Sequence, residues 1–439
     1  MTSAVDCVVH NARLIGRRQL QTISVRSGIV ESIQPSDNDT SDFEQAASAS
    51  TIDAQGSLAV AGLTDLYARL REPGQTRKGT ISSEAAAARR AGFTRIVCSP
   101  DTVPVVDSVA TVEWIRQRAA KDAAGVKIVP MAALTIALEG EQLSELATLQ
   151  SAGCAVASQA DQPILNTSVL YSAMEYARSF NMPLIMTARD AHIGSTGSAH
   201  SGATATRLGL PQTPIAAETV ALATLVELCQ ETECRLHVSR LSSARAVHQI
   251  ADAKQSGLPI TCDVGIHHLF YTDELLAGYD ATFHSAVPFR GHEDRQALRE
   301  GVAQGVIDAI CSDHAPHDKD AHLAPFADTE PGLSAYDWFI PLLMQLPTIT
   351  GLSIQAVFDK LTKIPSLMLG DGESSEIAIG ERANFFLLAP DERPAAPGSI
   401  YSAGKNNPLM LHAAETLGLP PLAGRVKAVI TEANMTRYE

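Results

Sequence analysis

The sequence contains no Cys-X-X-Cys pair, and its number of cysteines is odd. Disulfide scaffolds and zinc ribbons need cysteines that come in pairs at short spacings. The cysteines of this chain are instead scattered, and we expect each to be a reduced, buried apolar side chain of a cytosolic protein. They are Cys7, Cys98, Cys154, Cys229, Cys234, Cys262 and Cys311.

Positive charge and long apolar runs are also scarce. Lys and Arg total 34 against 49 Asp and Glu, which gives a formal net charge of −15. Nucleic acids and anionic membranes bind clustered positive charge, so this balance argues against both and favours a soluble protein or a basic protein partner. No apolar stretch approaches the ~18 residues of a membrane span, and Met1 to Leu20 lack the apolar core of a signal peptide. The expected location is the cytoplasm.

Apolar residues nevertheless make up 45% of the 439 positions, enough for a sizeable core. From residue 58 onward, short runs of β-branched or apolar residues alternate with longer helix-like runs. The predicted strands are 58–66, 94–98, 127–131, 154–158, 183–187, 234–239, 259–263 and 307–311. The predicted helices are 81–91, 108–123, 142–150, 165–179, 214–230, 243–256, 292–303 and 353–361.

This βα alternation predicts a parallel sheet, and eight strands are the number that closes a (β/α)₈ barrel. The span 58–370 exceeds the ~250 residues typical of that fold. Long loops are therefore expected, and the stretches 187–213 and 312–336 have the required polar composition, the first of them rich enough in Gly, Ser and Thr to be mobile. A doubly wound open sheet also fits the alternation.

Short strands are expected at both ends of the chain. Residues 22–26 and 29–34 flank Ser27-Gly28, a hairpin turn signal. Strand-like sequence returns after Gly370, at 383–388 and 425–431. We therefore predict one small β unit built from residues 1–57 and 371–439, beside a barrel of residues 58–370.

The side chains expected at the active-site end of the barrel are unusual for a hydrolase. A (β/α)₈ barrel carries its site at the C-terminal ends of its strands. Strands 1, 5 and 6 end in Tyr67, Arg69, Thr187 and Arg240. A hydrolytic metal site needs several His and carboxylate ligands around one ion, and a permanently cationic guanidinium would repel that ion.

Histidines follow strands 7 and 8 directly. The strand 8 loop carries Asp313, His314 and His317, and His267-His268 follow strand 7. These side chains could form a metal site if the two loops converge, although a buried histidine satisfied by hydrogen bonds is the commoner arrangement.

Six separated segments, in order along essentially the whole chain, resemble dihydroorotases of the amidohydrolase superfamily. The first is AVAGLTDLYARLREPGQTRKGTISSEAAAARRAGFTRIVCSPDTVPVVDS at 59–108. The others are RLGLPQTPIAAE at 207–218, RLHVSRLS at 235–242, His-His-Leu at 267–269, DRQALRE at 294–300 and IDAICSDHAPH at 307–317. The resemblance implies an amidohydrolase-type (β/α)₈ barrel with a small β-sandwich formed by both chain ends.

The resemblance also implies where metal ligands should lie, and there this sequence departs from the family. The family carries His-X-His-X-Arg after strand 1, a carboxylated Lys or an Asp after strand 4, and a His after each of strands 5 and 6. Of this ligand set only Asp313 remains, although Asp161 and His237 lie close to two of the replaced positions. The replaced positions are Tyr67, Arg69, Gln159, Thr187 and Arg240. The implied zinc site is therefore lost, and we expect no cofactor and no catalytic residue.

The implied substrate contacts are incomplete as well. Arg71 matches the arginine that binds the substrate carboxylate, and His317 matches a position near the substrate. The family's Asn after strand 2 corresponds to Asp101, whose negative charge would repel that carboxylate. Its Asn after strand 7 corresponds to Ala286. Arg71 and His317 are thus remnants of a substrate site.

Asp313 has two interpretations. As a surviving base it would accept a proton during hydrolysis. As the partner of an arginine it would form an ion pair with Arg69 or Arg240 in the vacated metal cavity, and this is the outcome we expect. Without a metal, neither a strong nucleophile nor a Lewis acid is available at neutral pH.

Three functions fit these observations. In the first, suggested by the resemblance, the chain is an inactive dihydroorotase homologue of pyrimidine biosynthesis. It is similar to bacterial dihydroorotase-like chains that lack the same ligands and are the non-catalytic partners of the aspartate carbamoyltransferase catalytic chain in a hetero-oligomer, needed for its assembly or activity.

The other two functions keep a working pocket. One is a metal-dependent cyclic-amide hydrolase, a dihydroorotase with a site rebuilt from Asp313, His314, His317 and either His267 or Asp161. The other is a small-molecule sensor that binds a carboxylate through Arg69, Arg71 and Arg240.

Overall fold

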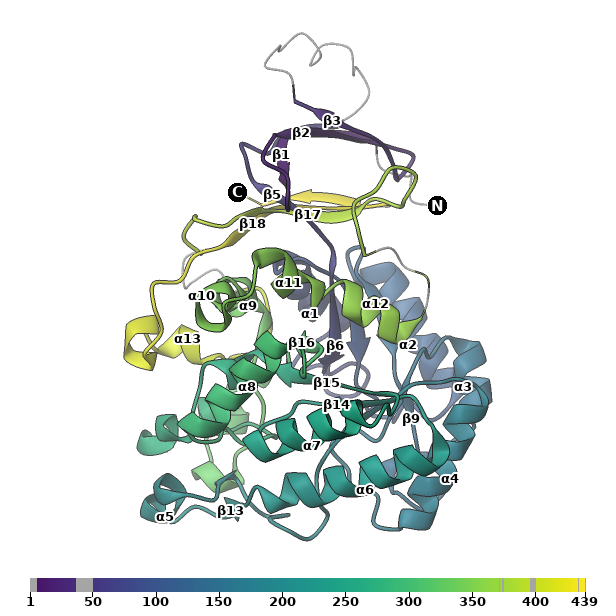
Figure 1. Ribbon diagram of the computed structural model, residues 1–439, viewed down its shortest axis with the longest axis vertical. Helices are drawn as coiled ribbons and strands as arrows, with labels where there is room; N and C mark the ends of the chain where they lie inside the picture. The colour runs from purple at the N-terminus through teal and green to yellow at the C-terminus, as the bar shows by residue number, and fades with distance from the viewer. Residues whose placement is uncertain are drawn as a thin grey trace.

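A computed structural model describes residues 6–36, 50–370, 372, 375–394, 400–432 and 434–438. The remaining positions of the predicted end unit, 1–5, 37–49 and short stretches after 370, lie outside the described residues. Figure 1 shows a strand-rich layer that contains both ends of the described chain, resting on a larger body of helices around a sheet.

The larger body is the predicted (β/α)₈ barrel, and this fold class is confirmed. Its parallel strands are hydrogen-bonded in chain order, with β8 and β9 as two pieces of one path around Met131. The barrel closes where Ala68 bridges His314 and the Arg69 N–H donates to the His314 carbonyl oxygen at 2.8 Å. The strands are β6 (Leu63–Ala68), β7 (Phe93–Cys98), β8 (Lys127–Pro130), β9 (Ala132–Ala133), β10 (Ala157–Ser158), β11 (Leu184–Thr187), β14 (Leu236–Ser239), β15 (Ile260–Gly265) and β16 (Ala309–Cys311).

Each predicted helix is present, with ends that shift by a few residues. Local sequence fixes several of the starts: Thr80 accepts from the Ser83 N–H in a capping box, and Ser243 caps its helix by accepting from the Ala246 N–H. The helices that follow the strands are α1 (Ile81–Arg90), α2 (Val109–Asp122), α3 (Leu146–Ala152), α4 (Thr167–Ser179), α6 (Ala216–Thr232), α7 (Ala244–Gln255), α8 (His292–Gln304) and α11 (Ile354–Asp359). Further helices are α5 (Ala203–Leu208), α9 (Tyr336–Leu343), α10 (Leu346–Thr350), α12 (Lys363–Leu369) and α13 (Pro408–Leu411).

Both ends of the chain meet in one β unit, as the sequence predicted. Strand β17 pairs antiparallel with β5 and β18. Strand β1 pairs with β5 on one side and with β2 on the other, so the sheet continues through β2 to β3. Along β17, Phe385 and Leu387 face the small core between the two layers, while Phe386 and Leu388 face the barrel core. The strands are β1 (Cys7–Leu14), β2 (Gln21–Arg26), β3 (Ile29–Pro35), β4 (Ser50–Asp53), β5 (Leu58–Ala61), β17 (Asn384–Ala389), β18 (Arg425–Thr431) and β19 (Asn434–Arg437).

The hairpin predicted at Ser27-Gly28 is confirmed, since β2 and β3 pair antiparallel across it. Gly28 has a φ of +74°, and a Cβ there would lie 2.6 Å from the Glu432 carbonyl oxygen, so the turn requires glycine. The β2–β3 hairpin can therefore pack closely against the chain end.

Two expectations about the chain's path are corrected. The strand predicted at 58–66 is broken at Gly62, where a Cβ would clash with Thr94 and Asn384. Residues 58–61 consequently pair in the end sheet, and only β6 enters the barrel. The loop predicted at 187–213 contains α5 and the short strands β12 (Ala199–His200) and β13 (Gln212–Thr213). The buried Arg290 holds this segment by donating to the Thr213 carbonyl oxygen at 2.9 Å.

All seven cysteines are free and buried, as the sequence predicted. Within the described part of the chain, no helix combines the length and apolarity that crossing a membrane would need.

Candidate functional site

Five charged side chains meet where the barrel strands end, and we call them the Arg–Asp cluster. Arg69 follows β6, Asp101 follows β7, Asp161 follows β10, Arg240 follows β14 and Asp313 follows β16. Both guanidinium groups are buried, Arg240 almost completely. The cluster thus fills the place where a barrel enzyme keeps its reacting groups.

Asp161 is shared by the two arginines. Its Oδ2 accepts from Arg69 Nη2 at 2.5 Å, and its Oδ1 accepts from Arg240 Nη2. Thr187 Oγ1 also donates to Oδ1, at 3.3 Å. Although burial alone would raise it, the pKa of Asp161 is held well below its usual range by Arg240 and Arg69. The carboxylate is therefore ionised and bound on both oxygens.

One further nitrogen of each arginine binds another carboxylate. Arg69 Nε donates to Asp101 Oδ2 at 2.8 Å, and Arg240 Nη1 donates to Asp313 Oδ1 at 2.9 Å. Burial raises and Arg69 then lowers the pKa of Asp101, with a net fall. The ion pair expected for Asp313 is confirmed, and its partner is Arg240.

Tyr67 forms the floor of the cluster. Its ring is fully buried and lies 3.9 Å from the guanidinium carbon of Arg240 and 5.3 Å from that of Arg69. Its hydroxyl accepts from Arg69 Nη2 and from Ser99 Oγ, both at 3.2 Å. Burial raises the pKa of this phenol, so the ring remains neutral and stabilises both cations through its face.

A polar network inside the barrel fixes Arg240. The Arg240 N–H donates to Asp263 Oδ1 at 2.6 Å, and the residue has a φ of +62°, a conformation unusual for arginine. Asp263 also lies 2.9 Å from His237 Nε2 and accepts from Ser239. His237 therefore supports the backbone beneath Arg240 and lies outside the cluster.

Gln159, one of the replaced ligand positions, does not join the cluster. Its Nε2 donates to Thr135 Oγ1 and to the Leu138 carbonyl oxygen, each at 2.9 Å. Ala160 has a φ of +51° and turns the chain, so Asp161 occupies the position in the site that Gln159 was expected to hold. From the sequence, Asp161 was noted as a neighbour of the replaced position and as a possible ligand of a rebuilt site, but not as a partner of Arg69 and Arg240.

The histidines near the site point to partners outside the Arg–Asp cluster. His314 Nε2 lies 2.8 Å from Glu84 Oε2, with its ring stacked on Tyr336 at 4.1 Å. His267 stacks on Tyr271, and burial lowers its pKa to about 3. The Nε2 atom of His268 lies 3.0 Å from the Val287 carbonyl oxygen, and burial lowers its pKa to about 4. The two loops do not bring these imidazoles together around Asp313.

The side chains present do not fit the zinc ion that the family resemblance implies. In the described residues, no group of three or more His, Cys, Asp or Glu is arranged to hold a metal. The oxygens of Asp161 and Asp313 that face the cluster are already bound by guanidinium groups. A divalent ion placed there would meet two permanent cations.

A cavity of about 600 Å³ opens above the cluster. Its lining includes Arg69, Arg71, Asp161, Arg189 and His317. Arg71 Nη2 lies 2.8 Å from His317 Nε2, and its Nε donates to the Pro316 carbonyl oxygen at 3.0 Å. Burial and the nearby Arg71 lower the pKa of His317 to about 2, so the imidazole is neutral. Arg71 and His317, which the sequence predicted to be remnants of a substrate site, thus line the cavity and contact each other.

Comparison with known proteins finds dihydroorotase-like relatives by sequence and a hydantoinase by structure. A family model described as dihydro-orotase-like matches residues 56–246. A dihydroorotase-like protein of Pseudomonas aeruginosa is 40% identical over 386 residues, covering 88% of this chain and 89% of its own. A dihydroorotase of Anaeromyxobacter sp. (strain K) is 35% identical over 393 residues, covering 89% of each chain. Among solved structures, an L-hydantoinase from Arthrobacter aurescens has a TM-score of 0.82 at 20% identity, covering 99% of this chain and 96% of its own.

Replacing Arg240 by methionine should strongly destabilise the protein. The variant removes the cation that Asp161 and Asp313 share and leaves the buried Asp313 without an ion-pair partner among the described residues. Losing one partner of a buried pair costs about 3–5 kcal/mol. Urea unfolding measures this loss. As a control, Arg382→Met removes an exposed pair with Glu432 at 3.3 Å and should cost less than about 1 kcal/mol. Equal effects of the two variants would contradict the central role of Arg240.

The cluster also predicts an acid-sensitive stability. The pKa of Asp161 is lower in the folded protein than the ~3.9 of an unfolded aspartate. Its contribution is therefore complete above about pH 4 and is lost as the pH falls toward the folded value. Urea midpoints measured from about pH 5 to about pH 3 should fall steeply for the wild type and less steeply for Asp161→Asn. If the urea midpoints of the wild type and of Asp161→Asn fell in parallel with pH, the ionisation of Asp161 would not be the source of the acid sensitivity.

Proposed function

The chain belongs to the dihydroorotase-like family, and from this premise we propose that it is a non-catalytic member of pyrimidine biosynthesis. The observation that carries the proposal is the position of Arg240. Its guanidinium binds Asp161 and Asp313 together, where the family's metal chemistry would need free ligands. The barrel is then retained as a scaffold.

The chemistry of the family explains why this substitution is decisive. Hydrolysis of a cyclic amide needs an activated water and a polarised carbonyl, and both come from a metal in this reaction class. The base must also be free to accept a proton from that water. In Asp313, the one retained ligand, Oδ1 already accepts a hydrogen bond from the Arg240 guanidinium, so this oxygen is not free to bind a water.

The histidines that a rebuilt hydrolytic site would need have other partners. Such a site would need His314, His317 or His267 beside Asp313. His314 is bound to Glu84, His317 lies against Arg71, and His267 stacks on Tyr271. A carboxylate sensor would bind its ligand through Arg69, Arg71 and Arg240. Arg69 and Arg240 are neutralised by the aspartates of the cluster, and Arg71 is bound to the Pro316 carbonyl oxygen and His317. The scaffold therefore accounts for more of these contacts than either alternative.

As the partner of this scaffold we propose the catalytic chain of aspartate carbamoyltransferase, in a cytoplasmic hetero-oligomer. Supporting this choice is the resemblance to dihydroorotase-like chains that lack the same ligands. The loss of the metal site leaves protein association as a reason to keep the whole fold. The proposed scaffold works without zinc or another cofactor.

Co-expression with the aspartate carbamoyltransferase chain of the same source tests this function. We expect the two chains to co-elute in size-exclusion chromatography and the transferase to lose activity or change size when expressed alone. The Asp313→Asn variant is the matched control, because asparagine still accepts from Arg240 but cannot act as a base. It should support the transferase as well as the wild type does. Separate elution with unaltered transferase activity would refute the proposal.

A further inference from the structure

A small cavity borders the Arg–Asp cluster, next to the larger one, and we call it the inner cavity. Its walls come from the chain that follows β11, β14 and β15 and from the start of α6. Arg240 lines it, whereas Arg71 and His317 line only the larger cavity. Its volume of about 30 Å³ holds one or two atoms of the size of a water oxygen. The inner cavity is therefore distinct from the substrate remnants and too small for their ligand.

The lining of the inner cavity carries more positive than negative charge. Its two carboxylates are Asp161, which the cluster binds on both oxygens, and Glu218. The oxygens of Glu218 accept from the Ser242 N–H at 2.7 Å and from Ser242 Oγ at 3.0 Å. Three arginines face these two carboxylates: Arg189, Arg240 and Arg290.

Arg290 is a buried cation without an ion pair in the described part of the chain. It is 4% exposed, and its Nε and Nη1 bind Ser242 Oγ, the Thr213 carbonyl oxygen and His200 Nδ1 at 2.9 to 3.1 Å. No described residue accepts a hydrogen bond from its Nη2. Burial lowers the pKa of Arg290, although two carboxylates nearby act in the opposite direction. Because a buried charge without a counter-ion is costly, an anion beside Nη2 would stabilise the folded chain.

Arg189 supplies a second unpaired guanidinium. It is half-buried and lines both cavities, so it lies where they meet. Among the described residues it makes one hydrogen bond, from Nη2 to the Ser195 carbonyl oxygen at 3.4 Å, and no ion pair. Its other nitrogens are therefore available to a ligand.

The start of helix α6 adds to the positive potential. The helix has 17 residues, and Ala217 and Glu218 of its first turn line the inner cavity. Its N-cap residue, Ile215, makes no side-chain hydrogen bond to the first turn. A helix N-terminus carries a partial positive charge and favours anions. The helix start and the unpaired Arg290 thus point independently to a negatively charged ligand.

We propose that the inner cavity binds one monovalent anion of about the size of chloride, between Arg189 and Arg290 Nη2. The excess positive charge of the lining favours an anion over a water molecule. The volume excludes larger anions such as sulfate and phosphate. The bound anion connects the segment that holds Arg189 and Thr213 to Arg290, which follows β15. This inference does not depend on the proposed function.

Thermal unfolding at constant ionic strength tests the proposal, with sodium gluconate replaced stepwise by sodium chloride. Gluconate is too large for the cavity. Chloride should raise the unfolding midpoint of the wild type by about 2 °C or more, because it binds only the folded chain. Arg189→Gln should lose most of this rise. Arg207→Gln is the matched control, since Arg207 is exposed on α5 outside the lining, and it should keep the full rise.

A crystal soaked in sodium bromide locates the anion, since bromide scatters anomalously. We expect one anomalous peak beside Arg290 in the wild type and none there in Arg189→Gln. Because general salt effects act alike on both proteins, an equal chloride-dependent rise in the wild type and in Arg189→Gln would overturn the proposal. The absence of a bromide peak in the wild type would overturn it too. Stabilisation by sulfate that chloride does not reproduce would contradict a site for one small anion.

Discussion

One partly buried carboxylate, that of Asp161, organises the end of the barrel. It binds Arg69 on one oxygen and Arg240 on the other, and through them it connects strands β6, β10 and β14 to Asp101 and Asp313. Two guanidinium groups without carboxylates could not remain in this buried position, because the cost of desolvating an unpaired charge is several kcal/mol. The cluster is therefore an interdependent unit.

The same interdependence explains how a metal-binding barrel can become a scaffold. A zinc ion and its ligands hold the strand ends of a hydrolase together from one centre. In this chain, the guanidinium groups of Arg69 and Arg240 connect the strand ends by hydrogen bonds to carboxylates. Both guanidinium groups lie over the ring of Tyr67. The strand ends of the barrel are thus joined to one another through ion pairs.

Much of the architecture was predictable because it follows from short-range patterns. The alternation of apolar and helix-like runs located the strands and helices within a few residues. Helix caps such as Thr80 and Ser243, seen in the structure, agree with these short-range patterns. The break at Gly62 was not predictable, because it depends on contacts with Thr94 and Asn384 that only the folded chain creates.

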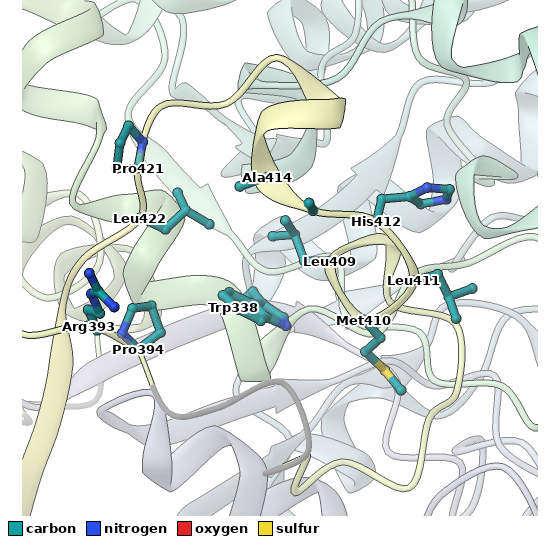
Figure 2. A pocket seen from close by; sticks show the side chains of 11 residues that line it. Trp338, Arg393, Pro394, Leu409, Met410, Leu411, His412, Ala414, Pro421 and Leu422 are labelled. Atoms are coloured by element: carbon teal, nitrogen blue, oxygen red, sulfur yellow. The ribbon is translucent and has the colours of Figure 1, made fainter.

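The site was predictable in composition but not in geometry. The residue types at the strand ends indicated that Arg69 or Arg240 would bind Asp313. The direction of Asp161 depends on the left-handed turn at Ala160, and no sequence pattern signals that turn. Another cavity, shown in Figure 2, is lined by residues 338, 393–394, 409–414 and 421–422. It was not predictable because these residues are far apart in the sequence.

The central claim is that guanidinium groups occupy the position of the family's metal. Bound zinc per chain tests it most directly, measured by atomic spectroscopy after equilibration with Zn²⁺ and removal of the free ion, for the wild type and for Asp161→Asn. The account predicts far less than one zinc per chain, with no difference between the two proteins. One zinc per wild-type chain that disappears in the variant would contradict it.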